Sequence, residues 1–402
     1  MASHSVGSTR RTILILGPIQ LGPLLNGFKI PNRSEVRGMG NTPVVNQALA
    51  LQDQGHRLAV ITLTDELSDH ALERYEGRDV TILVGRLRRN HGIKDFCRRE
   101  RQTLLTLIRE IDPDLIIANY AVEYALAALE SGKPSLVVLH DHAFNILKIH
   151  RFHPYWIVRF MVSLWVIVKA RRVVGVSNYV ASFARRLRFS AVPVICNPLQ
   201  ETTFHRYSER RFDDIKCGGG TMRIISVLSW SILKNPKPAL AAFSLLRRSH
   251  SNTEYYMIGP GLGHGEAAEI WASKNGLSEG VIFSGVLSNE DVLTLMTSSH
   301  ILLHPSLEEA VSMVILEAMA IGVPIIAGNN CAGVREVLDG GSRGCLVNSR
   351  NAKALSDSIC RLLQDPTDAL MKARCAHTHV LSQNHPQVFR QKVMKHLYSA
   401  LS

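Results

Sequence analysis

The sequence lacks an apolar run as long as the ~18 residues that a membrane-spanning helix needs. Its most apolar and aromatic stretch covers residues 152–172, but Arg159 interrupts this stretch, and Arg171 and Arg172 close it. We therefore expect no transmembrane helix. Residues 152–172 form either a helix buried in the core, which we favour, or an interfacial helix that lies on a membrane.

The cysteines form no recognisable framework. There are seven of them, an odd number, at positions 97, 196, 217, 331, 345, 360 and 375, and no two stand in a Cys-x-x-Cys pair. Disulfide-rich domains and zinc sites use paired, closely spaced cysteines. The pattern favours reduced thiols and a cytoplasmic protein, with a peripheral position at the inner face of the membrane as the alternative.

Aromatic residues are also scarce, at 6% of the chain, although the net charge is +12. Residues 1–200 carry 26 Lys and Arg against 16 Asp and Glu, a net charge of +10, whereas residues 201–402 carry 20 against 18, a net charge of +2. This imbalance suggests either a solubilising surface or an anionic partner, such as a membrane surface or a phosphorylated acceptor. We expect no nucleic-acid partner, because single-strand binders interleave aromatic and basic side chains.

Short apolar strands alternate with helical segments along the chain, which is typical of a parallel, doubly wound sheet. The length suffices for two domains. The strand candidates are 12–17, 58–63, 80–84, 115–118, 135–139, 172–176, 193–196, 222–228, 254–259, 281–285, 301–306, 323–328 and 344–347. Ligands of such sheets bind beyond the carboxyl ends of the strands.

Residues 304–328, HPSLEEAVSMVILEAMAIGVPIIAG, predict a strand end, a loop, a helix, a glycine stop and a second strand. The loop amides precede the helix, and a helix N-terminus favours anions. Two carboxylates mark the segment: Glu309 is placed to hold a hexose and Glu317 a ribose. The alternative is an ordinary helix with solvated glutamates.

The same segment resembles the donor-site signature of the retaining family 4 glycosyltransferases, which have the GT-B fold. The matching positions are Pro305-Ser306, Glu309, Glu317-Ala318-Met319-Ala320, Gly322 and Pro324. The Ala-Val-Ser triplet at 310–312 departs from the small-aromatic-small triplet of the family, so we expect a different sugar pocket.

The resemblance implies an α/β protein with two doubly wound, Rossmann-like domains facing a central cleft. Residues 1–204 would form an acceptor-binding domain, and residues 223–381 a nucleotide-sugar-binding domain, joined by a linker at 205–222. Residues 382–402 would form a closing helix that crosses back to the first domain.

The resemblance also implies roles for individual residues. The catalytic candidates are His140, Lys234 and Glu309. The donor-binding candidates are Gly38, Gly40, Ser229, Gly259, Gly261, Leu287, Ser306, Ala310, Val311, Ser312 and Glu317. Ser229 stands where the family has an arginine that joins the lysine on the donor phosphates, so one cation of that pair is missing.

No strong metal-binding constellation stands in the sequence. Asp112-Pro113-Asp114 has the form of an Asp-x-Asp metal motif, but it directly precedes a strand candidate and is better explained as a turn. We expect no metal and no cofactor, with a nucleotide-diphosphate sugar as the donor substrate.

The expected function is therefore retaining, metal-independent transfer of a sugar to a glycan or lipid-linked acceptor. Three alternatives stay open: a nucleotide-sugar 2-epimerase on the same fold, a non-catalytic nucleotide-sugar-binding homologue, and a nucleic-acid-binding protein. The serine at position 229 favours the second, and the net charge of +12 suggests the third.

Overall fold

The computed structural model describes residues 10–32, 36–38, 40, 42–52, 55–69, 71–88, 95–208 and 220–399. The chain divides into two compact units. Unit 1 comprises residues 1–198 and 386–402, and unit 2 comprises residues 199–385. Most of the linker expected at 205–222, namely residues 209–219, lies outside the described residues.

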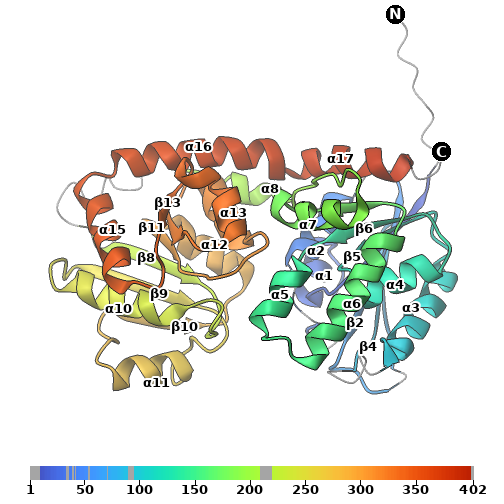
Figure 1. Cartoon of the computed structure of the whole chain (residues 1–402), viewed down its shortest axis with the longest axis horizontal. Helices are drawn as coiled ribbons and strands as arrows, with labels where there is room; N and C mark the ends of the chain where they lie inside the picture. Colours follow the sequence, from blue (N-terminus) through green and yellow to red (C-terminus); the bar gives the residue numbers. More distant parts are fainter. Residues whose placement is uncertain are drawn as a thin grey trace, which may run out of the picture. The chain divides into compact units, whose positions relative to one another are not determined.

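Unit 1 is built on a seven-stranded sheet in the order β3-β4-β2-β1-β5-β6-β7 (Figure 1). The strands are β1 (Thr12–Leu16), β2 (Arg57–Thr64), β3 (Glu73–Gly77), β4 (Val80–Arg86), β5 (Leu115–Asn119), β6 (Ser135–Leu139) and β7 (Val173–Gly175). All pairs are parallel except β3 with β4. The sequence missed β3, and the strand predicted at 193–196 is wrong, because only an isolated bridge between Gly175 and Val194 forms there.

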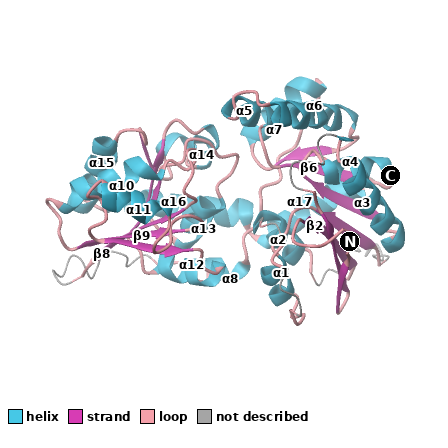
Figure 2. Cartoon of the chain, turned by 90° about the horizontal axis from the view of Figure 1, so that it is seen from below, coloured by secondary structure: helices cyan, strands magenta, loops and turns pink. Residues whose placement is uncertain are grey.

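The helices of unit 1 surround this sheet. They are α1 (Leu21–Gly27), α2 (Thr42–Ala50), α3 (Arg98–Ile111), α4 (Glu123–Glu130), α5 (Ala143–Ile149), α6 (Pro154–Lys169), α7 (Asn178–Arg188) and α17 (Pro386–Tyr398). Figure 2 shows α5, α6 and α7 as an outer layer on one side of the sheet.

Unit 2 contains a fully parallel six-stranded sheet in the order β10-β9-β8-β11-β12-β13. The strands are β8 (Met222–Val227), β9 (Thr253–Ile258), β10 (Val281–Gly285), β11 (Ile301–His304), β12 (Ile325–Gly328) and β13 (Cys345–Val347). The helices are α8 (Glu201–Phe204), α10 (Pro236–Arg247), α11 (Ala267–Lys274), α12 (Asn289–Thr297), α13 (Met313–Ile321), α14 (Ala332–Val337), α15 (Ala352–Gln364) and α16 (Thr367–Asn384). Two separate apolar clusters cover the two faces of the sheet, so the predicted doubly wound α/β fold is confirmed.

The closing helix begins at Pro386, a few residues after the expected boundary at residue 382. Helix α16 runs to Asn384 in unit 2, and α17 begins at Pro386 in unit 1. Proline at the first helical position suits a helix start and cannot continue the preceding one. Helix α17 packs against α2 and β6, and its last turn is held by a 2.9 Å hydrogen bond between Tyr398 Oη and His56 Nε2.

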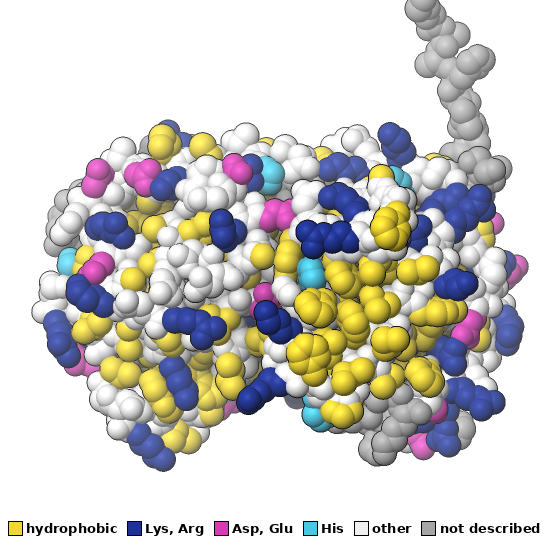
Figure 3. All heavy atoms as spheres, in the orientation of Figure 1, with side chains coloured by type: hydrophobic (Ala, Val, Ile, Leu, Met, Phe, Trp, Pro, Cys, Tyr) yellow, Lys and Arg dark blue, Asp and Glu magenta, His cyan; other side chains and the backbone are white. Residues whose placement is uncertain are grey.

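Most of the apolar stretch at 152–172 forms α6, and the predicted buried helix is correct for one face of it only. Val162, Val166 and Ile167 are buried, but Met161 and Trp165 are 57% and 47% exposed. Figure 3 shows apolar side chains gathered on the surface over α5 and α6. Within the described residues, no helix has both the length and the apolar character needed to cross a membrane.

The predicted glycine stop after α13 is confirmed. Gly322 has φ +82° and its amide bonds back to Met319 O at 3.2 Å. A Cβ at this position would lie 2.7 Å from the ring of Tyr207. Glycine is therefore required here for two reasons: the left-handed backbone disfavours residues with a Cβ, and the ring of Tyr207 fills the space that a Cβ would need.

We predict that Gly322→Ala lowers the free energy of unfolding by about 2 kcal/mol or more, since the left-handed backbone alone costs roughly 1–2 kcal/mol. Gly276→Ala is the matched control, because Gly276 has φ +66° but open space around a Cβ. Urea denaturation of both variants measures the difference. Equal losses of stability would show that Tyr207 makes room without cost.

Candidate active site

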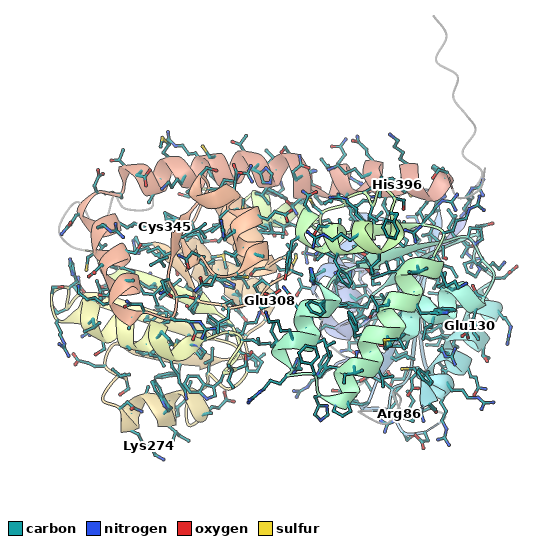
Figure 4. The ribbon with its side chains drawn as sticks, viewed as in Figure 1. Arg86, Glu130, Lys274, Glu308, Cys345 and His396 are labelled. Atoms are coloured by element: carbon teal, nitrogen blue, oxygen red, sulfur yellow. The ribbon has the colours of Figure 1, made fainter. Side chains whose placement is uncertain are left out.

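The site of unit 2 begins where two neighbouring strands end. Strands β8 and β11 are paired, and the loops that follow them meet: Leu307 N donates to Leu233 O at 2.8 Å. Asn235 fixes this contact, because its side-chain amide donates to Pro305 O at 3.2 Å and to Ser349 O at 2.9 Å. The sequence analysis did not identify Asn235, although it stands directly beside Lys234. Figure 4 labels Glu308, which belongs to the loop after β11.

Glu309 is the centre of this arrangement. Its Oε1 accepts from Lys234 Nζ at 2.5 Å, from Ser306 Oγ at 2.8 Å and from His304 Nε2 at 3.2 Å. Only 12% of its side chain is exposed. Burial by itself would raise the pKa of Glu309, but the hydrogen bond from His304 and the charge of Lys234 outweigh it and lower the pKa to about 2. Glu309 is therefore ionised at neutral pH.

The backbone of residues 310–312 leads from Glu309 into α13. Ser312 is the N-cap of the helix, and its Oγ accepts from Ile315 N at 3.4 Å. Gly333 allows the loop to approach α14 closely, since a Cβ there would lie 2.1 Å from Glu309 O. The helix N-terminus supplies partial positive charge beside the ionised Glu309 and Lys234.

Glu317 lies further along α13 in a different environment. It is 5% exposed, and Asn289 Nδ2 donates to its Oε1 at 3.3 Å. Burial raises the pKa of Glu317 to about 7, and the single amide donor opposes this only weakly. The two glutamates of the motif therefore differ in ionisation: Glu309 is a carboxylate, and Glu317 is divided between its acid and carboxylate forms near neutral pH.

The glycine loop after β9 packs on the loop after β8. Gly259 has φ +131°, and a Cβ there would lie 2.0 Å from Leu228 O, while a Cβ on Gly261 would lie 2.7 Å from Trp230 Cβ. Ser229 Oγ donates to Ser231 Oγ at 3.2 Å. Leu287 packs against the apolar cluster that contains α12 and α13. These predicted donor-binding positions thus lie near the carboxyl edge of the unit 2 sheet.

His140 lies at the carboxyl end of β6 in unit 1 and is 6% exposed. Its ring stacks on Tyr120, with centroids 4.6 Å apart. Asn119 Nδ2 donates to Leu16 O at 3.2 Å, so Asn119 Oδ1 faces His140 Nε2 at 2.7 Å and accepts a hydrogen bond from it. Burial lowers the pKa of His140 to about 3. The ring is therefore neutral, with Nε2 as donor and Nδ1 as acceptor.

A pocket opens beside His140 within unit 1. Its walls come from the ends of β5 and β6 and from α6, and include Tyr120, Trp156 and Phe160. Arg159 also lines it, with 24% of its side chain exposed and its guanidinium 3.7 Å from Glu123. The pocket is therefore mainly apolar and aromatic, with one cation, Arg159, and one carboxylate, Asp141, in its wall.

Gly38 and Gly40 lie in the loop between α1 and α2. Gly38 forms an isolated bridge with Gln20, and a Cβ on Gly40 would lie 2.8 Å from Gln20 Nε2. Glu66 Oε2 accepts from Gly38 N at 3.1 Å and from the amide of Arg37 at 2.7 Å. The carboxylate of Glu66 thus already accepts from the backbone amide of Gly38, one of the predicted donor-binding residues.

The aspartates of the Asp-x-Asp motif have structural partners. Asp112 ends α3 with a left-handed backbone and pairs with Lys133, and Asp114 Oδ2 accepts from Thr12 N at 2.7 Å. In the part of the chain that the structure describes, no three His, Cys, Asp or Glu side chains are grouped so that they could hold a metal ion.

The structure brings Lys234, Ser306 and Glu309 into direct contact, and it places Gly38, Gly40 and His140 in unit 1. Glu317 contacts Asn289 on α12 and not the Glu309 cluster. Sequence reasoning missed His304, although it directly precedes the Pro-Ser pair at the end of a strand. It also missed Asn119, a polar residue at the end of an apolar strand.

Solved structures with the same fold cover almost the whole chain. Sucrose-phosphate synthase from Thermosynechococcus elongatus superposes with a TM-score of 0.77 at 16% identity, covering 98% of this chain and 99% of that chain. HepE from Anabaena, solved with UDP and glucose, gives a TM-score of 0.70 at 18% identity, covering 97% and 100%. The architecture is therefore the GT-B fold of glycosyltransferases.

Two family models match the sequence. The model for Glycosyltransferase Family 4 matches residues 40–201, and the model for Glycosyl transferases group 1 matches residues 212–378. The chain belongs to the family 4 glycosyltransferases.

Curated relatives match over shorter segments. Glycogen synthase of Mycobacterium tuberculosis is 29% identical over 153 residues, covering 37% of this chain and 36% of the relative. D-inositol 3-phosphate glycosyltransferase of Corynebacterium urealyticum is 27% identical over 175 residues, covering 42% and 41%. The matched segments thus span about two fifths of these relatives or less.

We predict that Glu317→Gln stabilises the protein at high pH. Because its pKa is raised, Glu317 keeps its proton in the folded state between about pH 4.5 and pH 7, where the unfolded chain has already lost it. The free energy of unfolding therefore falls as the pH rises through this window and reaches its lower value above about pH 7. Glutamine has no charge to bury. The advantage of the variant should grow by up to about 3 kcal/mol between about pH 5 and about pH 8.

Urea denaturation at both pH values measures this difference. Glu279→Gln, at a side chain that is 86% exposed, is the control for losing one surface carboxylate. An advantage of Glu317→Gln that does not change with pH would show that Glu317 is not a buried acid.

Proposed function

We propose that this protein transfers a hexosyl group from a nucleoside diphosphate sugar to an acceptor hydroxyl, with retention of the anomeric configuration and without a metal ion. The observation that carries the proposal is the cluster of Lys234, Ser306 and Glu309 beside the N-terminus of α13. The family supports retention. The acceptor is a glycan or a lipid-linked sugar.

The chemical task is to stabilise the departing diphosphate. Its negative charge grows as the bond between the sugar C1 and the phosphate oxygen breaks, and preorganised donors aimed at that charge accelerate the step. Lys234 Nζ and the backbone amides of residues 310–312 are the donors of unit 2 that suit this task. Glu309 and Ser306 fix the position of Lys234, and the Glu309 carboxylate is suited to accept hydrogen bonds from sugar hydroxyls.

Retention needs an attack on the same face that the diphosphate leaves. In the proposed step the acceptor oxygen bonds to C1 while the bond from C1 to the diphosphate oxygen breaks, and the hydroxyl proton passes to a diphosphate oxygen. Glu309 is tied to Lys234, His304 and Ser306, so it is poorly suited to act as a covalent nucleophile. This supports a front-face route over the double displacement of retaining glycosidases.

His140 would serve as a hydrogen-bond acceptor for a sugar hydroxyl. Its Nε2 proton is engaged by Asn119, which leaves Nδ1 to accept. Because its pKa is about 3, the ring stays neutral throughout the physiological range. A neutral ring that accepts a hydrogen bond from a sugar hydroxyl orients the sugar without adding positive charge near C1.

A second candidate is a nucleotide-sugar-binding protein without transferase activity. Ser229 favours it, because this residue stands where the family has a second phosphate-binding cation and its hydroxyl is engaged with Ser231. The two functions share donor binding and differ in turnover with an acceptor.

A thermal-shift screen against UDP, GDP and ADP and their sugars tests donor binding, since a ligand of the folded state raises the unfolding midpoint. UDP is the first choice because HepE, a neighbour in fold, was solved with UDP and glucose. We expect a rise with one nucleoside diphosphate. The absence of a rise with every ligand would contradict both candidate functions.

We predict that Lys234→Met weakens binding of the preferred nucleoside diphosphate roughly tenfold to hundredfold, because one charge-assisted contact with the phosphates is lost. Binding of the corresponding nucleoside, which has no phosphates, should stay unchanged. Isothermal titration with both ligands measures the two affinities.

Lys274→Met, at a surface lysine labelled in Figure 4, controls for the loss of one positive charge. The double variant Lys234→Met/Glu309→Gln controls for the carboxylate that the single variant leaves unpaired. If Lys234→Met weakened nucleoside and nucleoside diphosphate equally, Lys234 would not be a phosphate ligand.

We also predict that the glycoside product keeps the anomeric configuration of the donor sugar. Proton NMR of the product during turnover distinguishes the two anomers through their coupling constants. An inverted product would contradict the front-face route, and turnover of the donor with no acceptor present would indicate an epimerase or a hydrolase.

A further inference from the structure

The outer face of α6 is apolar along its whole length. Ile157, Met161, Trp165 and Val168 recur at helical spacing, so they share one face, and they are 41%, 57%, 47% and 55% exposed. Single exposed apolar residues are ordinary on protein surfaces, but a contiguous exposed stripe marks an interaction site. The inner face of the same helix packs into unit 1 through Val162, Val166 and Ile167.

The apolar surface extends beyond α6. Phe144 on α5 is 43% exposed and Phe152, in the turn between α5 and α6, is 53% exposed. Arg151 and Phe152 both have positive φ, 51° and 57°, which non-glycine residues adopt at some cost. The turn thus exposes the ring of Phe152 to water. Figure 3 shows one apolar area over α5 and α6, bordered by many Lys and Arg and a few Asp or Glu side chains.

The segment that carries this surface has formal charges of one sign, although the exposed Asp141 directly precedes it. From residue 142 to residue 200 the sequence contains no Asp or Glu and nine cations: Lys148, Arg151, Arg159, Lys169, Arg171, Arg172, Arg185, Arg186 and Arg188. Lys148 and Arg151 lie near the start of α6, and Lys169 and Arg171 near its end, and all four are exposed. Four of the nine have partners inside unit 1: Arg159 faces Glu123, and three arginines donate to backbone carbonyls, namely Arg172 to Ser399 O, Arg185 to Val192 O at 3.1 Å and Arg188 to Ala170 O at 2.6 Å.

We propose that the outer face of α6, with Phe144 and Phe152, docks on the surface of an anionic phospholipid bilayer. A helix that lies in the interface buries an apolar face containing Trp and Phe among the acyl chains, while flanking Lys and Arg contact the lipid phosphates. The four apolar residues and the exposed cations at both helix ends have this arrangement. The positive charge of the exposed Lys and Arg thus favours an anionic bilayer as the partner of this surface.

This inference goes beyond sugar transfer and stands without it, because every residue involved lies outside the candidate donor site. It also bears on the acceptor. The inner side of α6 supplies Trp156, Arg159 and Phe160 to the pocket beside His140. A bilayer on the outer face of α6 would therefore lie one helix away from that pocket, which suits an acceptor carried by a lipid.

Flotation of the full chain with vesicles tests the proposal. We expect the protein to float with vesicles of phosphatidylcholine and phosphatidylglycerol and to stay behind with vesicles of phosphatidylcholine alone. Added salt should reduce the bound fraction, because exposed charges are screened beyond about 10 Å at 0.1 M ionic strength. Binding to neither kind of vesicle, or equal binding to both, would overturn the proposal.

Met161→Glu should abolish flotation, because it places a carboxylate in the middle of the apolar stripe. Met371→Glu is the matched control: Met371 lies on helix α16 of unit 2 and is 58% exposed, against 57% for Met161. Replacing Lys169 and Arg171 by Gln should weaken binding roughly fivefold for each cation removed. An equal effect of Met161→Glu and Met371→Glu would contradict the proposed surface.

Two further measurements keep the outcome clear. Thermal unfolding midpoints that match the wild type show that the variants fold. An unchanged rise of the midpoint with the nucleoside diphosphate shows that the donor site is intact. The proposals of membrane docking and of sugar transfer are therefore tested independently. Light scattering without lipid tests for self-association. A wild-type dimer that Met161→Glu converts to a monomer, together with no flotation, would assign the surface to a second copy of the chain and overturn the proposal.

Discussion

The candidate donor site depends on keeping one negative charge on Glu309 with little contact to water. Burial works against this charge, and the hydrogen bond from His304 and the charge of Lys234 outweigh it. Ser306 is a third hydrogen-bond donor to Glu309. His304 and Ser306 stand at the end of β11, and Lys234 stands in the loop after β8. They meet because β8 and β11 are neighbours in a parallel sheet, although 75 residues separate Lys234 from Glu309. The sheet order is therefore what creates the site.

The same sequence motif produces two carboxylates of opposite character. Glu309 stands in the loop, within reach of a lysine and two further donors, and is ionised. Glu317 stands on the buried side of α13 with one amide as its partner, so its charged form is disfavoured. Ionised Glu309 organises the cluster around itself. Glu317 would gain from a ligand whose hydroxyl groups donate to it, because such donors stabilise the carboxylate that burial disfavours.

The sequence was sufficient to predict the architecture, because both sheets consist of short apolar runs between helices and because the motif at 304–328 has a fixed spacing. It failed at the edge strand β3, whose sequence Glu-Arg-Tyr-Glu-Gly is charged and whose pairing with β4 is antiparallel. It also gave no indication that Lys234 and Glu309 contact each other, or that Glu66 occupies the Gly38 amide. Such contacts depend on tertiary placement, which residue type and local spacing do not encode.

Helix α6 shows why burial cannot be derived from composition alone. Its 16 residues are apolar on almost every side, a pattern typical of a helix enclosed by protein. In the structure only one side is enclosed, because α6 belongs to the outermost layer of unit 1 and nothing in the described chain covers its outer stripe (Figure 2). Packing against unit 1 requires apolar residues only on the inner face of α6, and polar residues on the outer stripe would make the protein more soluble. Ile157, Met161, Trp165 and Val168 are therefore better explained by a surface that the protein contacts than by the packing of the fold.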